Sequence, residues 1–257
     1  MNSRDQARRR FFARTIGAAG ALIVTGCEKL SESSWFPKVL GAGETASAAF
    51  ANLVTPKMAL AQEFTEADRS PTFRSNGTAM PDTDAYRGLL VDNFADYRLE
   101  IGGLVARPAS LSLSELKAMP SRTQITRHDC VEGWSAIAKW KGTKLAALLD
   151  AVQPKPDARF VVFHCADPME DGGTGFYYES IALDHAFHPQ TILAYEMNDA
   201  PLPVKNGAPL RLRVERQLGY KHAKYVMRIE LVQTFANIAG GHGGYWEDHG
   251  YQWFAGI

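Results

Sequence analysis

The sequence predicts an α+β fold, in which mixed β-sheets carry a few short helices. Three observations support this. Segments with the pattern of strands outnumber segments with the pattern of helices. The two kinds do not alternate in the regular rhythm of a parallel βαβ protein. The chain of 257 residues also has a globular composition, with 46% apolar and 22% charged residues.

The first expected elements lie in the middle of the chain. Residues 97–101 alternate apolar with polar side chains, as a half-buried strand does. Ser112 and Glu115 have the spacing of a capping box, which predicts a short helix that Pro120 ends. Apolar residues then recur with helical spacing over 145–152, which predicts a second helix.

Strands are expected over most of the chain beyond this second helix. Residues 159–165 are a continuous apolar run of strand length, and residues 191–197 form a second such run that ends at an Asn-Asp turn. Residues 210–214 alternate Leu or Val with Arg, which predicts a strand with one apolar and one charged face. A long strand is expected over 225–235, before a tail that is rich in glycine and aromatic residues.

The N-terminus, residues 1–27, has the features of an export signal. Three arginines and two phenylalanines at 8–12 precede a short apolar stretch, 16–25. Ten helical residues span about 15 Å, about half of a bilayer core, so this stretch is not a membrane span. A basic region before a short apolar region is typical of secretion, and the twin arginine resembles a Tat signal. Residues 24–27 resemble a lipobox, so we expect a periplasmic protein anchored by a lipid at Cys27; the alternative is an unmodified cysteine.

Two further segments come after the signal. Residues 28–70 are rich in Ser, Ala, Thr and Glu, and we expect a helical or flexible tether with helices near Phe50 and over 58–64. Residues 71–257 are expected to form the functional domain. The net charge of the chain is zero, and it falls to −4 without residues 1–26, which hold five arginines and one aspartate. Such a balance argues against a nucleic-acid partner.

Residues 127–135, Arg-His-Asp-Cys-Val-Glu-Gly-Trp-Ser, hold the densest chemistry in the chain. They show no periodicity and lie between the two predicted helices, so a loop is expected, and loops are where scaffolds place reactive groups. Arg127 and His128 beside Cys130 should lower the pKa of its thiol, making it a nucleophile or a metal ligand. The residue pattern alone is also compatible with a buried structural cysteine.

Several kinds of chemistry are compatible with Cys130. As a nucleophile it would need a base, either His128 or His164. A zinc site could combine these three with Cys165, but His164 and Cys165 are neighbours in a predicted strand and should face opposite sides. A single thiolate could instead bind a soft transition metal whose other ligands come from a cofactor. A disulfide between Cys130 and Cys165 would exclude all three.

Four motifs carry a resemblance to a known family. They are Cys-Val-Glu-Gly-Trp-Ser at 130–135, Trp-Lys-Gly with the following helix at 140–149, the segment 191–203, and Asn-Gly-Ala-Pro-Leu-Arg-Leu-Arg at 206–213. In order and spacing they resemble the sulfite oxidase superfamily of molybdopterin enzymes over 71–235. The layout is most similar to the bacterial branch that includes the catalytic subunit of periplasmic methionine sulfoxide reductase. This resemblance implies a molybdenum–molybdopterin cofactor.

The resemblance also implies the roles of particular residues. Cys130 stands where the family's thiolate binds molybdenum, and soft sulfur suits that metal. The remaining positions that match family contacts to the pyranopterin and its phosphate are Asn206, Arg211, His222, Ala223 and Lys224, with the backbone contributing at His222 and Ala223. Without the family, Arg211 and Lys224 would equally well be solvated surface charges.

Three further positions are weaker matches. Cys165 stands where the methionine sulfoxide reductase subunit has a threonine that contacts the cofactor. A thiol is a poorer hydrogen-bond partner than a hydroxyl. Residues 73–77 resemble the early pterin-contacting segment, which makes Asn76 a candidate cofactor ligand. Arg74 and His128 are candidate catalytic residues that would orient a substrate oxygen; capping the loop is the alternative for His128.

The implied activity is oxygen-atom transfer to or from a small S-oxo or N-oxo substrate such as sulfite or a sulfoxide. The chain has no Cys-x-x-Cys-His haem motif, so electrons must be exchanged with an external partner, a membrane or soluble cytochrome. The family's dimerisation domain would need a further domain's worth of chain, so we expect a monomer. Alternative functions are a noncatalytic binding module on the same fold and a cysteine hydrolase. The aromatic tail is expected to roof the site, form a docking face, or pack on its own sheet.

Overall fold

The computed structural model describes Trp35, residues 58–169 and residues 175–257. The chain divides into two compact units, 1–55 and 56–257, and all described residues except Trp35 belong to the second. The predicted export signal, Cys27 and the helix expected near Phe50 therefore lie outside the described residues. Within the described part, none of the helices combines the length and the apolar character that a membrane crossing needs.

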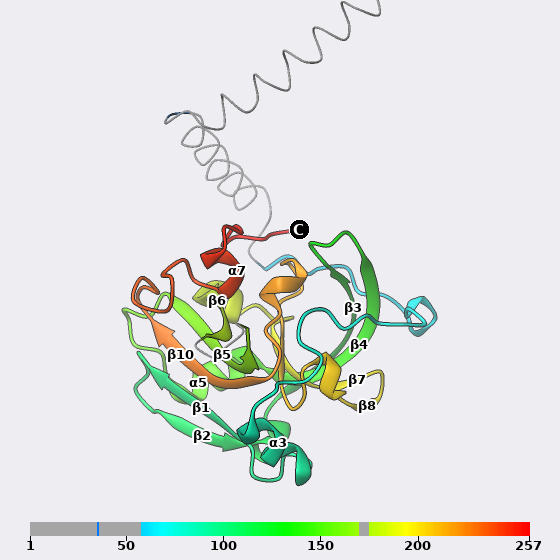
Figure 1. Cartoon of the computed structure of the whole chain (residues 1–257), viewed down its shortest axis with the longest axis horizontal. Coiled ribbons are helices and arrows are strands. Elements are labelled where there is room, and N and C mark those ends of the chain that lie inside the picture. The colour runs from blue at the N-terminus through cyan, green and yellow to red at the C-terminus, as the bar shows by residue number, and fades with distance from the viewer. Residues whose placement is uncertain (1–34, 36–57, 170–174) are drawn as a thin grey trace, which may run out of the picture. The chain divides into compact units, whose positions relative to one another are not determined.

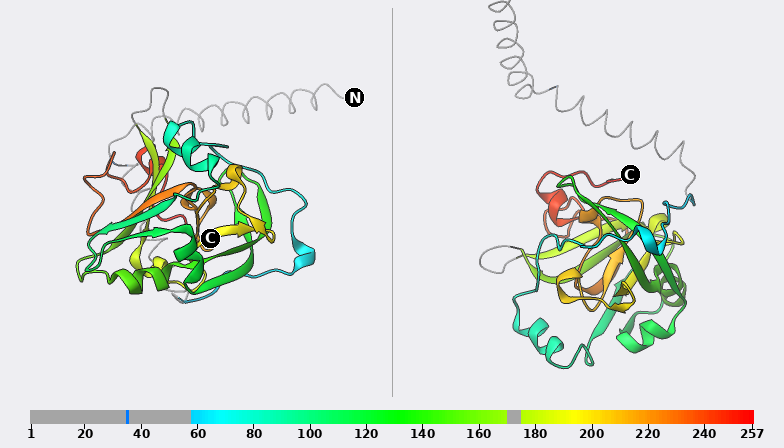
Figure 2. Two further views of the ribbon diagram at one scale, coloured as in Figure 1. Left: turned by 90° about the horizontal axis from the view of Figure 1, so that it is seen from below. Right: turned by 90° about the vertical axis from the view of Figure 1, so that its right-hand side faces the viewer.

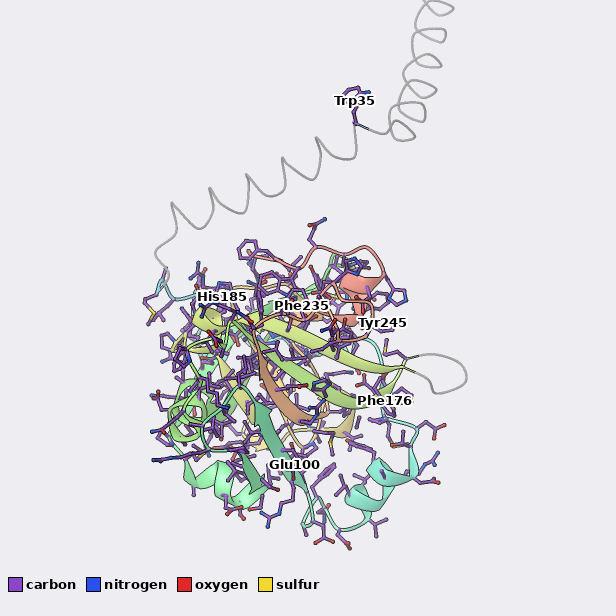
Figure 3. The ribbon with its side chains drawn as sticks, turned by 90° about the vertical axis from the view of Figure 1, so that its left-hand side faces the viewer. Trp35, Glu100, Phe176, His185, Phe235 and Tyr245 are labelled. Atoms are coloured by element: carbon purple, nitrogen blue, oxygen red, sulfur yellow. The ribbon has the colours of Figure 1, made fainter. Side chains whose placement is uncertain are left out.

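The first of two sheets has five strands in the order β2-β1-β10-β5-β6 (Figure 1). These strands are β1 (Arg98–Gly103), β2 (Ala109–Ser112), β5 (Phe160–Pro168), β6 (Phe176–Ala182) and β10 (Val226–Val232). Strand β1 runs parallel to β10, while the other neighbours are antiparallel, so the sheet is mixed. Figure 3 looks onto this sheet, with Glu100 labelled on β1 and Phe176 labelled on β6.

The second sheet is antiparallel and contains the order β3-β4-β7-β8, with β9 also pairing with β7. Its strands are β3 (Ser121–Asp129), β4 (Ser135–Lys144), β7 (Ile192–Met197), β8 (Ala200–Pro201) and β9 (Arg211–Arg213). Because β9 belongs to this sheet and β10 to the first, the segment between them connects the two sheets.

The described helices are short, as the α+β prediction requires. They are η1 (Glu66–Asp68), α3 (Asp84–Val91), α4 (Leu113–Ala118), α5 (Leu145–Val152), α6 (Leu183–Ala186), η2 (Val204–Asn206), η3 (Gly219–Lys221) and α7 (Tyr245–Asp248). The two helices predicted for the middle of the chain are confirmed. The capping box of Ser112 and Glu115 begins α4, and α5 buries the side chains at its first, fourth, fifth and eighth positions in the core.

Residues 127–135 are not the loop that the sequence predicts. Strands β3 and β4 form a hairpin, paired from Ser121 with Thr143 to Asp129 with Ser135, and only the turn between them is irregular. Every second residue of β3 is buried, as in any half-buried strand, but the buried ones are Gln124, Thr126 and His128. Because the inward-facing side chains are polar, hydrophobic alternation does not reveal this strand.

The helix expected over residues 58–64 is also wrong, because this segment is extended. Glu63 forms a bridge to Thr126, and the N–H of Phe64 donates to the carbonyl of Ile125 at 2.9 Å. Figure 2 shows this segment (cyan) beside the hairpin. Since β3 is at the edge of its sheet, the segment satisfies backbone groups that an open edge would leave unpaired.

Gly142 provides a test of the packing between β4 and β7. A Cβ at this position would lie 2.3 Å from the carbonyl oxygen of Leu193, which is backbone and cannot rotate away. We expect Gly142→Ala to lower the free energy of unfolding by about 1–3 kcal/mol through overpacking, measured by urea denaturation. Gly102→Ala, where a Cβ meets nothing within 4 Å, is the matched control in the first sheet and should unfold like the parent. A loss of equal size in both variants would contradict the packing argument.

Candidate functional site

A cavity of about 150 Å³ lies where the β3–β4 turn, residues 76–78, η3 and the C-terminal segment meet. Four of the residues singled out from the sequence line it, namely Asn76, Cys130, His222 and Lys224. Five others are buried without lining it, namely His128, Cys165, Asn206, Arg211 and Ala223. Arg74 is exposed and is not part of the lining. The structure therefore gathers most of the candidates around one cavity but brings neither Arg74 nor His128 to its surface.

Cys130 begins the turn of the hairpin. Its N–H donates to the carbonyl of Trp134 at 2.9 Å, and its own carbonyl accepts from Gly133, whose φ of 83° places it in the left-handed region that favours glycine. The thiol is 8% exposed and faces the cavity. This tight turn fixes the direction of the sulfur.

The prediction of a lowered pKa for Cys130 is wrong. Burial raises the pKa of the thiol, and hydrogen bonds from the backbone N–H groups of Glu132 and Val131 oppose that rise only in part. Arg127 contributes little because its guanidinium binds Asp129, with Nε 2.8 Å from Oδ1. A metal-free Cys130 is therefore a poor nucleophile, since the thiolate is the reactive form.

Two alternatives for the cysteines are excluded within the described part of the chain. Cys130 and Cys165 are both free, so they form no disulfide. Residues 58–169 and 175–257 hold no cluster of three His, Cys, Asp or Glu side chains that could bind a metal ion, which removes the zinc site. The strand prediction for β5 explains this, because His164 pairs with Glu230 while Cys165 points into the core.

His128 lies behind the cavity. Its Nδ1 accepts a hydrogen bond from Nη1 of Arg213 at 3.0 Å, and a Cβ on Gly219 would lie 2.6 Å from its Nε2. Burial, reinforced by the charges of Arg211 and other neighbours, lowers the pKa of His128 well below its usual value. The ring is therefore neutral and packs directly against the backbone of η3, which is a positioning rather than a substrate contact.

A group of buried cations lies beside this histidine. Arg211 and Arg213 are both fully buried in β9, and both guanidinium groups lie over the ring of Trp140, at 5.5 Å and 4.5 Å. Arg213 is neutralised by Glu215. Arg211 has no carboxylate partner among the described residues, and it donates only to the carbonyl of Asn206 at 3.2 Å. The charged face predicted for residues 210–214 thus exists, but it is buried.

Lys224 adds a second cation that forms no ion pair with a carboxylate of the described residues. Its ammonium group donates to three backbone carbonyls, those of Asn76 at 2.7 Å, Lys205 at 3.2 Å and Thr78. Burial and the charge of Arg211 lower the pKa of Lys224 to about 7. Burial and Arg213 similarly lower the pKa of Arg211 to about 9. Burial is the main cause of both shifts, and the carboxyl of Asp167 opposes the shift of Lys224.

Several buried polar side-chain atoms in and near the cavity have no hydrogen-bond partner within the described chain. Buried side-chain atoms without a hydrogen-bond partner in the described chain include Asn76 Oδ1, His128 Nε2, Asp167 Oδ1, Asn206 Nδ2, Arg211 Nε and Nη2, and His222 Nδ1. Folded proteins rarely leave such atoms unsatisfied, and each costs about 1–3 kcal/mol. Three of these six residues, Asn76, Asp167 and His222, line the cavity. The unpaired atoms include acceptor oxygens as well as donor nitrogens, so they match a bound group that has both donors and acceptors. A pyranopterin with its phosphate has both.

The sequence analysis missed several lining residues. Asp167 lines the cavity at the end of β5, and burial raises the pKa of its carboxyl to about 6. Tyr177, Tyr220, Trp246 and Tyr251 also line it. The aromatic tail was noted in the sequence, but no pattern shows which ring turns toward Cys130. One predicted contact is already occupied, because the N–H of His222 donates to the carbonyl of Gly219 at 3.1 Å.

A buried ion cluster joins the tail to this site. Lys221 of η3 binds Glu179 of β6 and Glu247 of α7, and all three side chains are at most 1% exposed. Tyr177 donates its hydroxyl proton to the carbonyl of Tyr220 at the same place. Two carboxylates share one ammonium, and burial raises the pKa of Glu179 above its usual value. Two of the three roles expected of the tail are therefore seen, since it packs on β6 and it lines the cavity.

Removing the cation of this cluster should destabilise the fold. Lys221→Met leaves two buried carboxylates without a counter-charge, so we expect a loss of about 3–5 kcal/mol in the free energy of unfolding at neutral pH. The raised carboxyl pKa means that the folded variant keeps a proton that the unfolded chain releases. Its deficit should therefore appear as the pH rises past the ordinary glutamate value of 4.5 and should be smaller near pH 4.

Lys141→Met is the matched control for this prediction. Lys141 pairs with Glu196 near the surface, with its side chain 42% exposed, so its loss should change the unfolding curve little at either pH. Urea denaturation of both variants at two pH values measures the difference. Equal losses, or a pH-independent loss in Lys221→Met, would show that the cluster does not have the assigned charge balance.

Comparisons with known proteins agree with this geometry. Residues 88–237 match the family described as "Oxidoreductase molybdopterin binding domain". A subunit from Azospira oryzae named YedZ1, assigned by its name to protein-methionine-sulfoxide reductase, is 36% identical over 250 residues that cover 97% of this chain and 88% of the relative. The protein-methionine-sulfoxide reductase catalytic subunit MsrP of Ralstonia nicotianae is 33% identical, covering 91% of this chain and 72% of its own length.

A solved structure supports the fold alone. The crystal structure of the sulfane dehydrogenase SoxCD from Paracoccus pantotrophus superposes with a TM-score of 0.50 at 23% identity, over 55% of this chain and 39% of that chain. The mixed sheets, the family match over more than half of the chain and the two relatives lead to one conclusion. This chain belongs to the oxidoreductase molybdopterin-binding family, of sulfite oxidase type, and is an oxidoreductase enzyme that binds molybdopterin.

Proposed function

We propose that this enzyme reduces methionine sulfoxide through a molybdenum–molybdopterin cofactor bound at the Cys130 cavity. The observation that carries the proposal is that Cys130 lines one cavity together with Asn76, Asp167 and His222, each of which has an unpaired buried polar atom. The substrate follows the two relatives whose names state protein-methionine-sulfoxide reductase. In the overall reaction a sulfoxide takes up two electrons and two protons and gives a thioether and water.

The chain's residues take distinct parts in holding the cofactor. Cys130 is the metal ligand, since a thiolate suits a soft transition metal, and a bound cation displaces the proton that burial otherwise retains. Asn206 and Arg211 hold the pyranopterin through the side-chain nitrogens that now lack partners. Lys224 and the backbone near Ala223 bind the phosphate, which neutralises the excess of buried positive charge. When bound, the cofactor supplies the two-electron chemistry of oxygen-atom transfer.

Other side chains shape this environment. Neutral His128 supports η3 through Gly219 and contacts the ring of His222, with centroids 5.0 Å apart. The proposal therefore gives His128 and Arg74 no contact with the reacting atoms, which differs from the roles that the sequence suggested. Cys165 lies in the apolar core and contributes packing.

The cellular setting is part of the same proposal. Residues 1–27 direct export after folding around the cofactor, with Cys27 as the lipid anchor, and residues 71–257 act as a monomeric catalytic domain. Electrons come from an external cytochrome. Elemental analysis for molybdenum tests the central claim, on protein exported by its own signal in a host that makes molybdopterin. About one molybdenum per chain is expected, and folded protein without molybdenum or pterin would overturn it.

The metal-ligand role predicts the behaviour of Cys130→Ser. The variant should fold like the parent, because backbone hydrogen bonds of residue 130 with Trp134 and Gly133 hold the turn, and serine keeps both. It should lose reduction of methionine sulfoxide with a reduced viologen dye as electron donor. Unchanged turnover with a normal melting temperature would remove Cys130 from the site.

The phosphate role predicts a different result for Lys224→Met. Its pterin content should fall, because a neutral side chain no longer balances the phosphate. In the cofactor-free parent, the lowered pKa of Lys224 means that the unfolded chain binds a proton the folded one does not, so stability should rise from pH 7 to pH 9. The cofactor-free variant should show a shallower rise in melting temperature, since Arg211 then acts alone. Identical pH profiles, or an undiminished pterin content, would contradict the assignment.

A further inference from the structure

The lining of the cavity divides into two chemical classes. Its buried polar residues are Asp167, His222 and Lys224. Two of its four aromatic residues, Trp246 and Tyr251, come from the C-terminal segment, and their rings stack with centroids 5.2 Å apart and planes inclined by 28°. Tyr220 meets Tyr251 edge-on at 5.3 Å. The stacked pair lies C-terminal to residue 237, where the family match ends.

We propose that Trp246 and Tyr251 form the specificity-determining wall of this active site, where they bind the apolar arm of a neutral sulfoxide. The inference rests on the proposed function, because it assumes that a sulfoxide is reduced in this cavity. It adds the residues that select the substrate and the chemical class that they select.

The exposure of the lining separates the substrate end from the cofactor end. Tyr251 is 39% exposed and Val131, next to Cys130, is 47% exposed, so both lie at the mouth. The groups that suit the cofactor are far less accessible, since Lys224 is 7% exposed and Arg211 is completely buried. A molecule that enters from solvent therefore passes the aromatic pair first.

The charge at the mouth favours a neutral substrate. Glu132 is the charged lining residue that is exposed there, while the cations are buried and committed to the phosphate. An anion such as sulfite would meet a carboxylate and apolar rings at the entrance. A methionine sulfoxide side chain instead presents methylene groups and sulfur, which make favourable contacts with aromatic rings.

The wall is held in place before any substrate arrives. The N–H of Tyr251 donates to the carbonyl of Trp246 at 2.9 Å, and the hydroxyl of Tyr220 donates to the carbonyl of Gln252 at 2.6 Å. Glu247, which is next to Trp246 in the chain, is bound to Lys221 in the buried ion cluster. A preformed wall contributes to affinity because little ordering is needed on binding.

The test compares Trp246→Leu with Phe176→Leu in the molybdenum-loaded enzyme. Phe176 of β6 is an aromatic residue that is 49% exposed and lines another hollow, so it serves as the control. Two substrates are used: N-acetylmethionine sulfoxide amide, which has an apolar arm, and dimethyl sulfoxide, which lacks one. Readouts are kcat and KM for each, molybdenum content, and calorimetric affinity of the oxidised enzyme for the first compound.

We expect Trp246→Leu to raise both KM and Kd for the methionine compound about tenfold, with little change in kcat, in KM for dimethyl sulfoxide or in molybdenum content. Tyr251→Ser should act in the same direction, and Phe176→Leu should behave like the parent. If the loaded parent reduces neither sulfoxide, the proposed function fails and this inference with it. If the parent is active but Trp246→Leu matches Phe176→Leu, only the wall is wrong. Loss of molybdenum from Trp246→Leu would assign the ring to the cofactor and overturn the inference.

Discussion

The organising constraint of this molecule is the burial of cations, two of which, Arg211 and Lys224, form no direct ion pair with a carboxylate of the described residues. Arg211 and Arg213 are fully enclosed over Trp140, Lys224 lies close by, and Glu215 neutralises only Arg213. A buried ion without a partner is costly, and the lowered pKa values of Lys224 and Arg211 express that cost. In the proposed function, the phosphate of the cofactor would give these two cations an anionic partner.

The two sheets and the β3–β4 hairpin determine where these cations and Cys130 lie. Strand β9 pairs with β7 in the second sheet, and the chain then crosses through η3 to β10 in the first. Arg211 and Arg213 of β9 therefore precede the connecting segment in the chain, and Lys224 follows η3 just before β10. The β3–β4 turn brings Cys130 to the same place. The fold thus combines charge from one part of the chain with a thiol from another that is distant in sequence.

The sequence predicted the parts of this arrangement that obey local rules. Helix α4 has a capping box, and helix α5 has apolar residues at helical spacing. Most of the apolar strands were also predicted from their sequence pattern. The predictions from the sequence were wrong where burial in the folded protein outweighs the properties of neighbouring residues in the chain. The buried positions of strand β3 are the polar residues Gln124, Thr126 and His128, so the strand shows no hydrophobic alternation. The pKa of Cys130 rises because burial outweighs the effect of nearby charges. Motif resemblance located Asn206, Arg211 and Lys224, but the aromatic wall depends on how the tail folds back, which no spacing within the tail encodes.

The ammonium group of Lys224 has a consequence for the order in which the molecule is assembled. It binds the carbonyls of Asn76 and Thr78, joining positions 148 and 146 residues apart in the chain. Both segments line the cavity, so a bound cofactor would bridge the beginning and the end of the domain. Binding of the cofactor would then require β10, the last strand, to have folded already. In the proposed function, the enzyme would acquire its cofactor as a nearly finished protein, and the loaded state would be a checkpoint before the proposed export.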